Sequence, residues 1–316
     1  MTKVTIDTAL EQHHLQKLIK QFPQAEFCLC EELAEEKELL LETEVLVTYG
    51  WKLTAELVRR MPKLKWIQAL RAGVDNFPDG EITKQGIVVT TVRGIHGIPM
   101  AEHAFGMMLS FSRELLAFRG AQSQKQWRRD MSPNEIYGMT LGVVGTGSIG
   151  REVARRGTAF GMMVLGVNTS GNPVDGIEKM FSAKKLEVLL KQCDYVVVTL
   201  PLTDATYHMF GEQEFSQMKS TAYFINLARG QVVEEPAMVK ALQEKEIAGA
   251  GLDVFEEEPL SPNSPLWEME NVLITPHLAA LSPRYTTRAV DVFATNLAAY
   301  LAAESLHNVM NWKRGY

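Results

Sequence analysis

Three apolar runs in the second half of the chain are each followed closely by side chains suited to chemistry. These side chains, given with the run before each, are Arg229 after YFIN, Asp253 and residues 256–258 after AGAGL, and His277 after VLIT. In open α/β sheets, ligands bind beyond the carboxyl ends of the strands, where such residues would lie. An arginine there can bind an anion, a carboxylate can orient an imidazole, and a histidine can transfer a proton.

Each of these residues also has a purely structural interpretation. Arg229 can pair with the end of a helix, and His277 can pack beside Pro276. The three glutamates, residues 256–258, can form a solvated acidic loop, which is the usual fate of such runs. Structural ion pairs and buried histidines are common, so no single residue establishes chemistry. The functional interpretation rests on two observations together. All of these residues follow successive predicted strands, and a predicted nucleotide-binding turn precedes them in the chain.

That turn is the glycine-rich segment GTGSIG. It directly follows the strand-like run TLGVV and opens the helix-like stretch IGREVARRGTAF. The first glycine permits a tight turn, the second lets the backbone approach a pyrophosphate, and the third lets helix and strand pack closely. A helix N-terminus adds free N–H groups and a positive dipole end. A tight turn without a ligand is the alternative, but the strand–turn–helix context favours dinucleotide binding. The predicted cofactor residues here are Gly145, Thr146, Gly147, Ser148, Ile149 and Gly150.

The elements around these residues alternate between short apolar runs and amphipathic stretches, which is typical of parallel α/β sheets. In the first part, strands are predicted at residues 4–6, 26–30, 45–48 and 65–69, and helices at 9–22 and 54–61. A long helix is predicted from about residue 98 to 116, since Pro99 suits a first helical turn. The basic stretch 122–133 is predicted to be a connection.

A second alternating series begins at residue 140. Its predicted strands are residues 140–144, 163–167, 195–199, 222–226, 248–252 and 272–275, and its predicted helices are 149–160, 183–192 and 235–245. Six strands with crossover helices match a doubly wound nucleotide-binding sheet. A last helix is predicted to open at Ser282 and Pro283, because serine can cap a helix and proline fits its first position.

Composition narrows the class of protein. A chain of 316 residues, 46% of them hydrophobic, is near the size at which one core divides into two domains. The net charge of −6 does not favour nucleic acid as a partner. The N-terminus lacks the apolar core of a signal peptide, and no apolar run approaches bilayer length, so no membrane association is expected. Three cysteines suit a reducing compartment, and the pair Cys28 and Cys30 has no matching ligand cluster. We therefore expect a cytoplasmic protein without a metal site.

The ordered motifs GTGSIG, NLARG, LDVFEEEP and TPHLAAL resemble the D-isomer-specific 2-hydroxyacid dehydrogenase family over roughly residues 45–287. The resemblance implies a Rossmann-type doubly wound parallel sheet as coenzyme domain, residues 97–285. This domain would be inserted into a smaller flavodoxin-like α/β substrate domain, residues 1–96 and 286–316. The family also implies a homodimer. The segment RGIHG, residues 93–97, resembles the branch that contains glyoxylate/hydroxypyruvate reductases.

By this resemblance the protein reduces a small 2-oxo acid to its D-2-hydroxy acid, and catalyses the reverse, with NAD(P)(H). Arg229 would hold the substrate carboxylate and carbonyl, and His277 would give a proton to the carbonyl oxygen. Glu258 would orient His277 and favour its charged form, while the other two glutamates, Glu256 and Glu257, would be solvated. In the segment ALRAGVDN the backbone of Ala72, Gly73 and Val74 would bind the substrate carboxylate. Further cofactor contacts are expected from Thr199, Leu200, Pro201, Ala228 and Asp253, with Asp253 bonded to the nicotinamide carboxamide.

The residues after the second strand of the coenzyme domain depart from the usual NAD pattern. An acidic residue there accepts hydrogen bonds from the ribose and repels a 2′-phosphate. This chain has Asn168, Thr169 and Ser170 instead. NADP is therefore favoured over NAD. The alternative is that Asn168 closes a turn, as asparagine often does, and that both cofactors are used.

Two other functions compete with this one. A non-catalytic NAD(P)(H)-sensing module can share the fold, since fold does not determine function. A related enzyme can act on another substrate, such as phosphoglycerate or formate. The complete arginine, glutamate and histidine set argues against the first, and the lack of a regulatory domain after the last helix argues against an allosteric phosphoglycerate enzyme.

Overall fold

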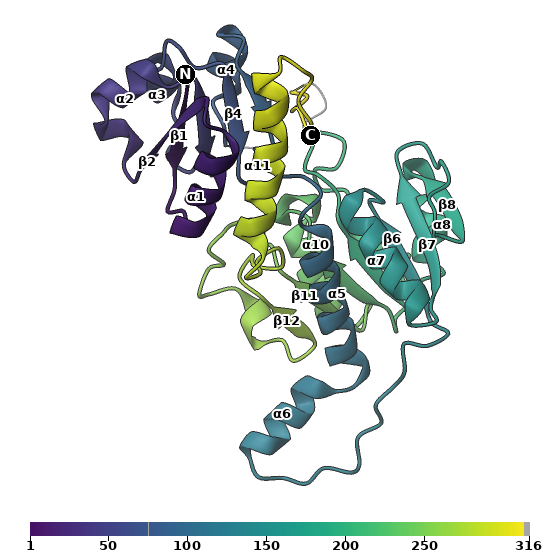
Figure 1. Ribbon diagram of the computed structural model, residues 1–316. Coiled ribbons are helices and arrows are strands. Elements are labelled where there is room, and N and C mark those ends of the chain that lie inside the picture. The colour runs from purple at the N-terminus through teal and green to yellow at the C-terminus, as the bar shows by residue number, and fades with distance from the viewer. Residues whose placement is uncertain (75, 313–316) are drawn as a thin grey trace. The chain divides into compact units, whose positions relative to one another are not determined.

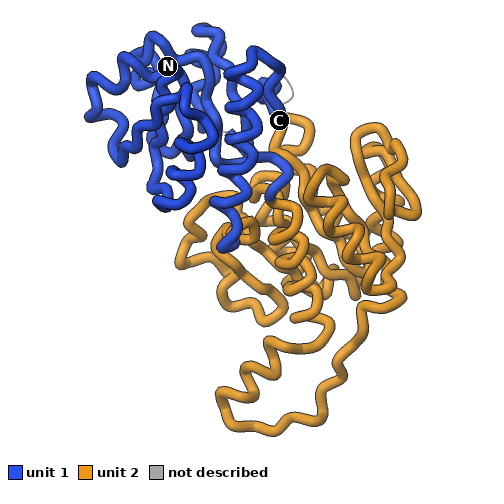
Figure 2. Tube along the Cα trace, in the orientation of Figure 1, with its two compact units in different colours: residues 1–95, 282–316 blue, residues 96–281 orange. Residues whose placement is uncertain are grey.

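The computed structural model describes residues 1–74 and 76–312, and the chain divides into two compact units. Unit 1 comprises residues 1–95 and 282–316, and unit 2 comprises residues 96–281 (Figure 2). The junctions fall at 95/96 and 281/282, against 96/97 and 285/286 expected from the sequence.

Unit 1 contains a parallel sheet, in the order β2-β1-β3-β4-β5 within the described residues. Its strands are β1 (Thr2–Asp7), β2 (Ala25–Cys30), β3 (Val45–Thr48), β4 (Trp66–Ala69) and β5 (Val88–Thr90). Its helices are α1 (Gln12–Gln21), η1 (Leu33–Glu35), α2 (Lys37–Glu42), α3 (Ala55–Arg59), α4 (Asp79–Lys84) and α11 (Tyr285–Leu301). This strand order is flavodoxin-like, as predicted.

Successive strand residues face opposite layers of unit 1, as a pleated strand requires. Leu46 packs with the layer formed by α2, α3 and α4, whereas Val45 and Val47 pack with α1 and α11. The amide of Asn296 on α11 donates to Gln68 Oε1 on β4 at 3.2 Å, and both side chains are buried. Buried polar groups need partners, so this bond joins the C-terminal helix to the N-terminal sheet.

Unit 2 contains a second parallel sheet, in the order β12-β11-β10-β9-β6-β7-β8 within the described residues. Its strands are β6 (Thr140–Val144), β7 (Met163–Asn168), β8 (Lys179–Ser182), β9 (Tyr195–Val198), β10 (Tyr223–Asn226), β11 (Gly249–Leu252) and β12 (Val272–Ile274). Its helices are α5 (Gly97–Ser112), α6 (Leu115–Ser123), α7 (Ser148–Ala159), η2 (Ala183–Lys185), α8 (Leu186–Leu190), α9 (Glu212–Ser216), η3 (Gly230–Val232), α10 (Glu235–Gln243) and η4 (Pro265–Glu268). The order reverses between β6 and β9, as in a doubly wound Rossmann sheet.

The sheet of unit 2 is covered on both faces. Tyr195 and Val197 pack with α5 and α7, which lie side by side in Figure 1, whereas Val196 and Val198 pack with α8, α9 and α10. A strand buried on both faces reads as a continuous apolar run, and YVVV is such a run. The predicted α/β fold class is therefore confirmed. None of the helices in the described part of the chain combines the length and apolarity needed to cross a bilayer.

The long helix predicted through residue 116 is wrong. Helix α5 ends at Ser112, and Glu114 adopts a left-handed backbone with φ of 57°. This conformation interrupts the helical hydrogen bonds, and α6 then extends away from the sheet of unit 2 (Figure 1). The predicted connection therefore starts later than expected, because α6 continues to Ser123.

Three smaller predictions also need correction. The last helix begins at Tyr285 rather than at Ser282 and Pro283, because residues 283–284 form a turn closed by the Tyr285 N–H bond to Ser282 O. The helix predicted at 183–192 is a 3₁₀ turn, η2, followed by the short α8. The edge strand β8 was not predicted, because KMFS is short and only one of its residues is buried. The sheet of unit 2 thus has seven strands in the described residues instead of the six expected.

Candidate active site

The glycine turn of unit 2 leaves no room for side chains at its first and third glycines. Gly145 has φ of 98°, and a Cβ added there would lie 3.0 Å from Leu200 N. A Cβ added at Gly150 would lie 2.1 Å from Gly145 O. Thr199 secures the turn from the neighbouring strand, since its hydroxyl donates to Gly145 O at 2.7 Å.

The same turn has the features that a pyrophosphate needs. Among the described residues, no atom lies within 4 Å of a Cβ added at Gly147, so backbone there faces open space. Helix α7 begins at Ser148, and its first internal bond runs from Arg151 N–H to Gly147 O. The N–H groups of residues 148–150 precede that bond and point out of the helix. The turn therefore fits the pyrophosphate of a dinucleotide.

The remaining predicted cofactor residues surround the ends of β9 and β10. Thr199 and Leu200 are half-buried after β9, and Pro201 is exposed. Ala228 is buried after β10, and its N–H donates to the side chain of Asn226 at 3.0 Å. Thr146 is buried within the glycine turn, whereas Ile149 is half-buried on the first turn of α7.

Asn168 closes a turn at the end of β7. Its Oδ1 accepts the N–H of Gly171 at 2.6 Å, and its Nδ2 donates to Asn172 O at 3.1 Å and weakly to Thr146 Oγ1 at 3.4 Å. The side chain is thus used within the protein. Thr169 and Ser170 are exposed, and the Ser170 hydroxyl makes two weak bonds of 3.4 Å within the turn, donating to Asn168 Oδ1 and accepting the N–H of Asn172.

Asp253 is buried and holds the segment after β12. Its Oδ1 accepts the hydroxyl of Thr275 at 2.5 Å and the N–H of Leu278 at 3.0 Å, and its Oδ2 accepts the N–H of Ala279 at 2.9 Å. Its backbone carbonyl accepts the N–H of His277 at 2.8 Å. Three successive N–H groups therefore end on one residue, and this fixes the backbone that carries His277.

His277 lies beside Glu258. The distance from His277 Nδ1 to Glu258 Oε2 is 2.7 Å, and the two side chains are 49% and 36% exposed. Burial alone would raise the pKa of Glu258, but hydrogen bonds from His277 and from the N–H of Phe255, and then the charges of His277 and Arg229, outweigh it and lower that pKa. Glu258 is therefore an ionised partner for an imidazole whose Nε2 remains for a substrate.

Arg229 follows β10 and is half-buried. Its NH1 group donates to Ala228 O at 2.8 Å, and Asn226 donates to the carbonyl of Arg229 at 3.2 Å. Burial and then the Arg229 charge lower the pKa of the buried His96 to about 4. At neutral pH the group near Arg229 is therefore a neutral imidazole and not a second cation.

Two histidines of this region had no signal in the sequence. His103 on α5 lies with its Nε2 3.0 Å from Thr275 Oγ1. Because Thr275 donates to Asp253, it accepts from His103, which places the proton of that imidazole on Nε2. His208 lies 2.5 Å from Glu256, so the expectation that Glu256 is solvated is wrong. Glu257 is exposed. Partners 48 residues apart in the chain leave no local pattern.

The predicted substrate loop belongs to unit 1 and follows β4. Ala72 and Gly73 are half-buried and Val74 is buried. Asp75, which completes the motif, lies outside the described residues. The assignment of these residues to the substrate stays a prediction.

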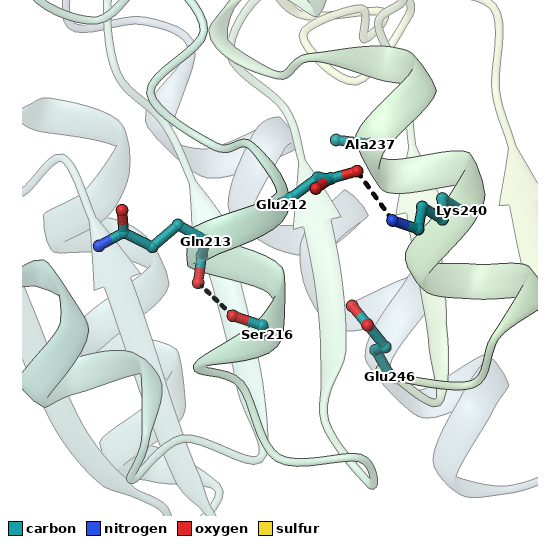
Figure 3. A pocket seen from close by; sticks show the side chains of 6 residues that line it. All are labelled: Glu212, Gln213, Ser216, Ala237, Lys240 and Glu246. Atoms are coloured by element: carbon teal, nitrogen blue, oxygen red, sulfur yellow. Dashed lines mark hydrogen bonds and ion pairs between the residues drawn. The ribbon is translucent and has the colours of Figure 1, made fainter.

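The structure has two further features that involve none of the predicted site residues. A surface hollow of about 420 Å³ lies between α9 and α10 and contains none of the predicted site residues (Figure 3). Glu212 and Lys240 form an ion pair of 2.9 Å across it. In unit 1, ligand atoms of Glu11, His13 and His14 lie within 4.8 Å of one another at the start of α1. The residues that line the hollow include no residue of the glycine turn and neither His277 nor Glu258.

Comparison with known proteins agrees with this geometry. Residues 105–279 match the model of the D-isomer specific 2-hydroxyacid dehydrogenase NAD binding domain. A glyoxylate reductase of Korarchaeum cryptofilum is 38% identical over 264 residues, covering 81% of this chain and 79% of the relative. The structure of the Sinorhizobium meliloti NADPH-dependent glyoxylate/hydroxypyruvate reductase in complex with NADP and sulfate is 29% identical, with a TM-score of 0.84 and coverage of 100% of both chains. Aquifex aeolicus D-lactate dehydrogenase, solved with NAD and lactic acid, is 29% identical, with a TM-score of 0.78 and coverage of 96% of both chains.

The chain belongs to the D-isomer specific 2-hydroxyacid dehydrogenase family. It is an oxidoreductase that acts on CH–OH donors and uses a nicotinamide dinucleotide. The function predicted from the sequence, reduction of a 2-oxo acid with NAD(P)H, is confirmed at this level.

Proposed function

We propose that the protein is a reductase of small 2-oxo acids such as glyoxylate or hydroxypyruvate. The observation that carries the proposal is the His277–Glu258 pair, 2.7 Å apart, on the same sheet edge as Arg229 and the glycine turn. The glyoxylate reductase of Korarchaeum cryptofilum and the reductase of Sinorhizobium meliloti support this substrate class. Neither a sensing module nor a phosphoglycerate enzyme is favoured by those relatives.

The residues of the chain divide the work. A reduced nicotinamide, when bound, supplies the hydride. Arg229 binds the substrate carboxylate through a charge-assisted pair of hydrogen bonds. His277 holds a proton on Nε2 and gives it to the carbonyl oxygen, while Glu258 keeps the imidazole oriented and stabilises its charged form. Asp253 holds the backbone of His277 in place, and its predicted bond to the nicotinamide is part of the proposal.

We propose NADP rather than NAD as the preferred cofactor. The support is that position 168 has an asparagine instead of an acidic residue, that Thr169 and Ser170 are exposed, and that Arg151 at the start of α7 is exposed. The NADP complex of the Sinorhizobium meliloti reductase favours this choice, whereas the NAD complex of the Aquifex aeolicus enzyme shows that relatives differ.

We also propose a homodimer in the cytoplasm. The homodimer rests on the family alone, and light scattering that gives 35.4 kDa in solution would contradict it. The cytoplasm rests on the cysteines Cys28, Cys30 and Cys193, which are free thiols.

A substrate and cofactor panel tests the proposal. Glyoxylate, hydroxypyruvate, pyruvate and bulkier 2-oxo acids are each supplied with NADPH and with NADH, and kcat/KM is measured. The small acids with NADPH should give the highest values. The variant Thr169→Asp adds a charge that repels a 2′-phosphate without touching the Asn168 turn, and Thr169→Asn is its neutral control. A preference for NADH in the parent, or unchanged selectivity in Thr169→Asp, would contradict the cofactor choice.

A further inference from the structure

A second histidine–glutamate pair lies close to His277 and Glu258 and has no role in the reaction described so far. His208 Nε2 lies 2.5 Å from Glu256 Oε1, and the two side chains are 33% and 29% exposed. His208 has a left-handed backbone with φ of 48° in the loop after β9. Glu256 lies in the loop after β11, two residues before Glu258.

The pair is part of a closed ring of three residues. The backbone N–H of His208 donates to Gln231 O at 2.8 Å, and the side-chain amide of Gln231 donates to Glu256 O at 2.8 Å. The side chains of Glu256 and His208 close the ring. The backbone N–H of Glu256 is held as well, since it donates to Glu235 Oε2 at 3.2 Å. The ring therefore ties together the loops that follow three neighbouring strands, β9, β10 and β11.

This ring adjoins the residues assigned to the reaction. Gln231 lies two residues after Arg229, and Gly230 between them packs so closely that an added Cβ would lie 1.8 Å from Phe255 C. The N–H of Phe255 in turn donates to Glu258 Oε1 at 3.1 Å. Movement of Glu256 would therefore be transmitted to the carboxylate that orients His277.

We propose that His208, Gln231 and Glu256 are positioning residues, which hold Glu258 where it orients His277 during reduction of the 2-oxo acid. This inference rests on the proposed function of His277. An exposed ion pair alone would contribute little. This pair differs because it closes a ring whose other two bonds use main-chain groups of the same residues, so the side-chain contact fixes the position of the loop that carries Glu256 and Glu258 relative to the loop that carries His208.

Other charged groups surround the pair. Glu235 of α10 faces Glu256, and Glu257 follows it in the same loop, while the ring of Tyr207 stacks on His208 with centroids 4.0 Å apart. Burial raises the pKa of Glu235. The hydrogen bond from the backbone of Glu256 lowers this pKa in part, whereas the charges of Glu256 and Glu257 raise it further.

A double-mutant cycle tests the proposal. His208→Asn removes the imidazole but keeps the left-handed backbone, which asparagine tolerates. We expect its kcat for a 2-oxo acid to fall about 10-fold, because misplacement of a catalytic group is costly. In a Glu258→Gln background the same substitution should cause no further loss, since the residue through which it acts is already changed. Glu256→Gln, which keeps the backbone bonds of residue 256, should show the same pattern.

The Glu212–Lys240 pair, drawn in Figure 3, supplies a control because it is an ion pair on the same unit. Within the described residues, neither of its side chains bonds to His208, Gln231 or Glu256. Glu212→Gln should leave kcat unchanged in both backgrounds. Additive losses for His208→Asn and Glu258→Gln, or a normal kcat in His208→Asn, would overturn the proposal.

A second readout separates this inference from the proposed function. If the parent reduces no 2-oxo acid, the proposed function fails. The same double-mutant cycle can then be measured by NMR titration of the His277 imidazole, whose signal is assigned by its loss in His277→Asn. The ring requires that His208→Asn alters the His277 titration in the parent and leaves it unaltered in Glu258→Gln. An unaltered titration in both backgrounds would overturn the positioning role as well.

Discussion

His277 combines three features that suit a proton donor. Its Nδ1 is held by Glu258, its backbone is held by Asp253, and its side chain is about half exposed. A donor needs all three, since it must be oriented, fixed in place and open to substrate. The backbone at this position has φ of 52°, so the residue that replaces histidine in a test must tolerate that conformation.

His277→Asn is the substitution that meets this condition. Asparagine adopts left-handed backbone readily, so the fold around Asp253 should persist. Loss of a positioned acid lowers kcat by about 10²–10⁴-fold. The affinity for NADPH, measured by nucleotide fluorescence, should stay within about 2-fold, because the residue does not belong to the glycine turn. Near-normal turnover would exclude His277 as the donor.

Glu258→Gln should change the pH dependence of reduction. Glu258 and protonated His277 stabilise each other, which is why the bond to His277 helps to lower the pKa of Glu258. Removal of the negative charge makes the protonated donor less stable, so it is lost at lower pH. The alkaline limb of the kcat/KM profile should move down by about one pH unit. An unmoved limb would show that the pair does not act in the reaction.

The elements of unit 2 position these residues by bringing the carboxyl ends of β10, β11 and β12 to one edge. Strands with continuous apolar runs, such as YVVV, were predictable because burial on both faces leaves that pattern. The break between α5 and α6 was not, because it depends on one residue, Glu114, in an unusual conformation. His208 was missed because its partner is distant in the chain. Motif residues such as Gly145 were predictable because a tight phosphate-binding turn requires glycine at fixed positions.

The two kinds of glycine in the turn should respond differently to alanine. Gly150→Ala places a Cβ 2.1 Å from Gly145 O, so backbone must move, and the cost is about 1–3 kcal/mol in the free energy of unfolding. Gly147→Ala meets no atom of the described residues and should leave stability unchanged. It occupies the space proposed for the pyrophosphate, so NADPH affinity should fall about 10-fold, or about 1.4 kcal/mol. The turn would not be the cofactor site if Gly147→Ala bound NADPH as tightly as the parent. The close packing would be refuted if Gly150→Ala melted at the same temperature as the parent.

On the scale of the whole molecule, buried ionisable groups make stability depend on pH. His96 is buried at the start of α5, and burial followed by the Arg229 charge lowers its pKa from 6.5 to about 4. Between pH 6.5 and pH 4, His96 is protonated in the unfolded chain but stays neutral in the folded protein. Stability should therefore fall as pH decreases from 6.5 towards 4.

His96→Gln isolates this contribution, because glutamine stays neutral in both states. From pH 7.5 to pH 5 the parent should lose about 2 kcal/mol more unfolding free energy than the variant, as calculated from the shifted pKa. Urea unfolding of both proteins at the two pH values measures this difference. If the unfolding free energy depended on pH in the same way in parent and variant, the pKa of His96 would not be lowered in the folded protein.

Reduction of a 2-oxo acid to its D-2-hydroxy acid is tested most directly by chiral analysis of the product that the parent protein forms from hydroxypyruvate and NADPH. The arrangement of Arg229, Glu258 and His277 in a member of this family predicts D-glycerate, in an amount equal to the NADPH consumed. Formation of L-glycerate, or no product under conditions in which the protein binds NADPH, would contradict it.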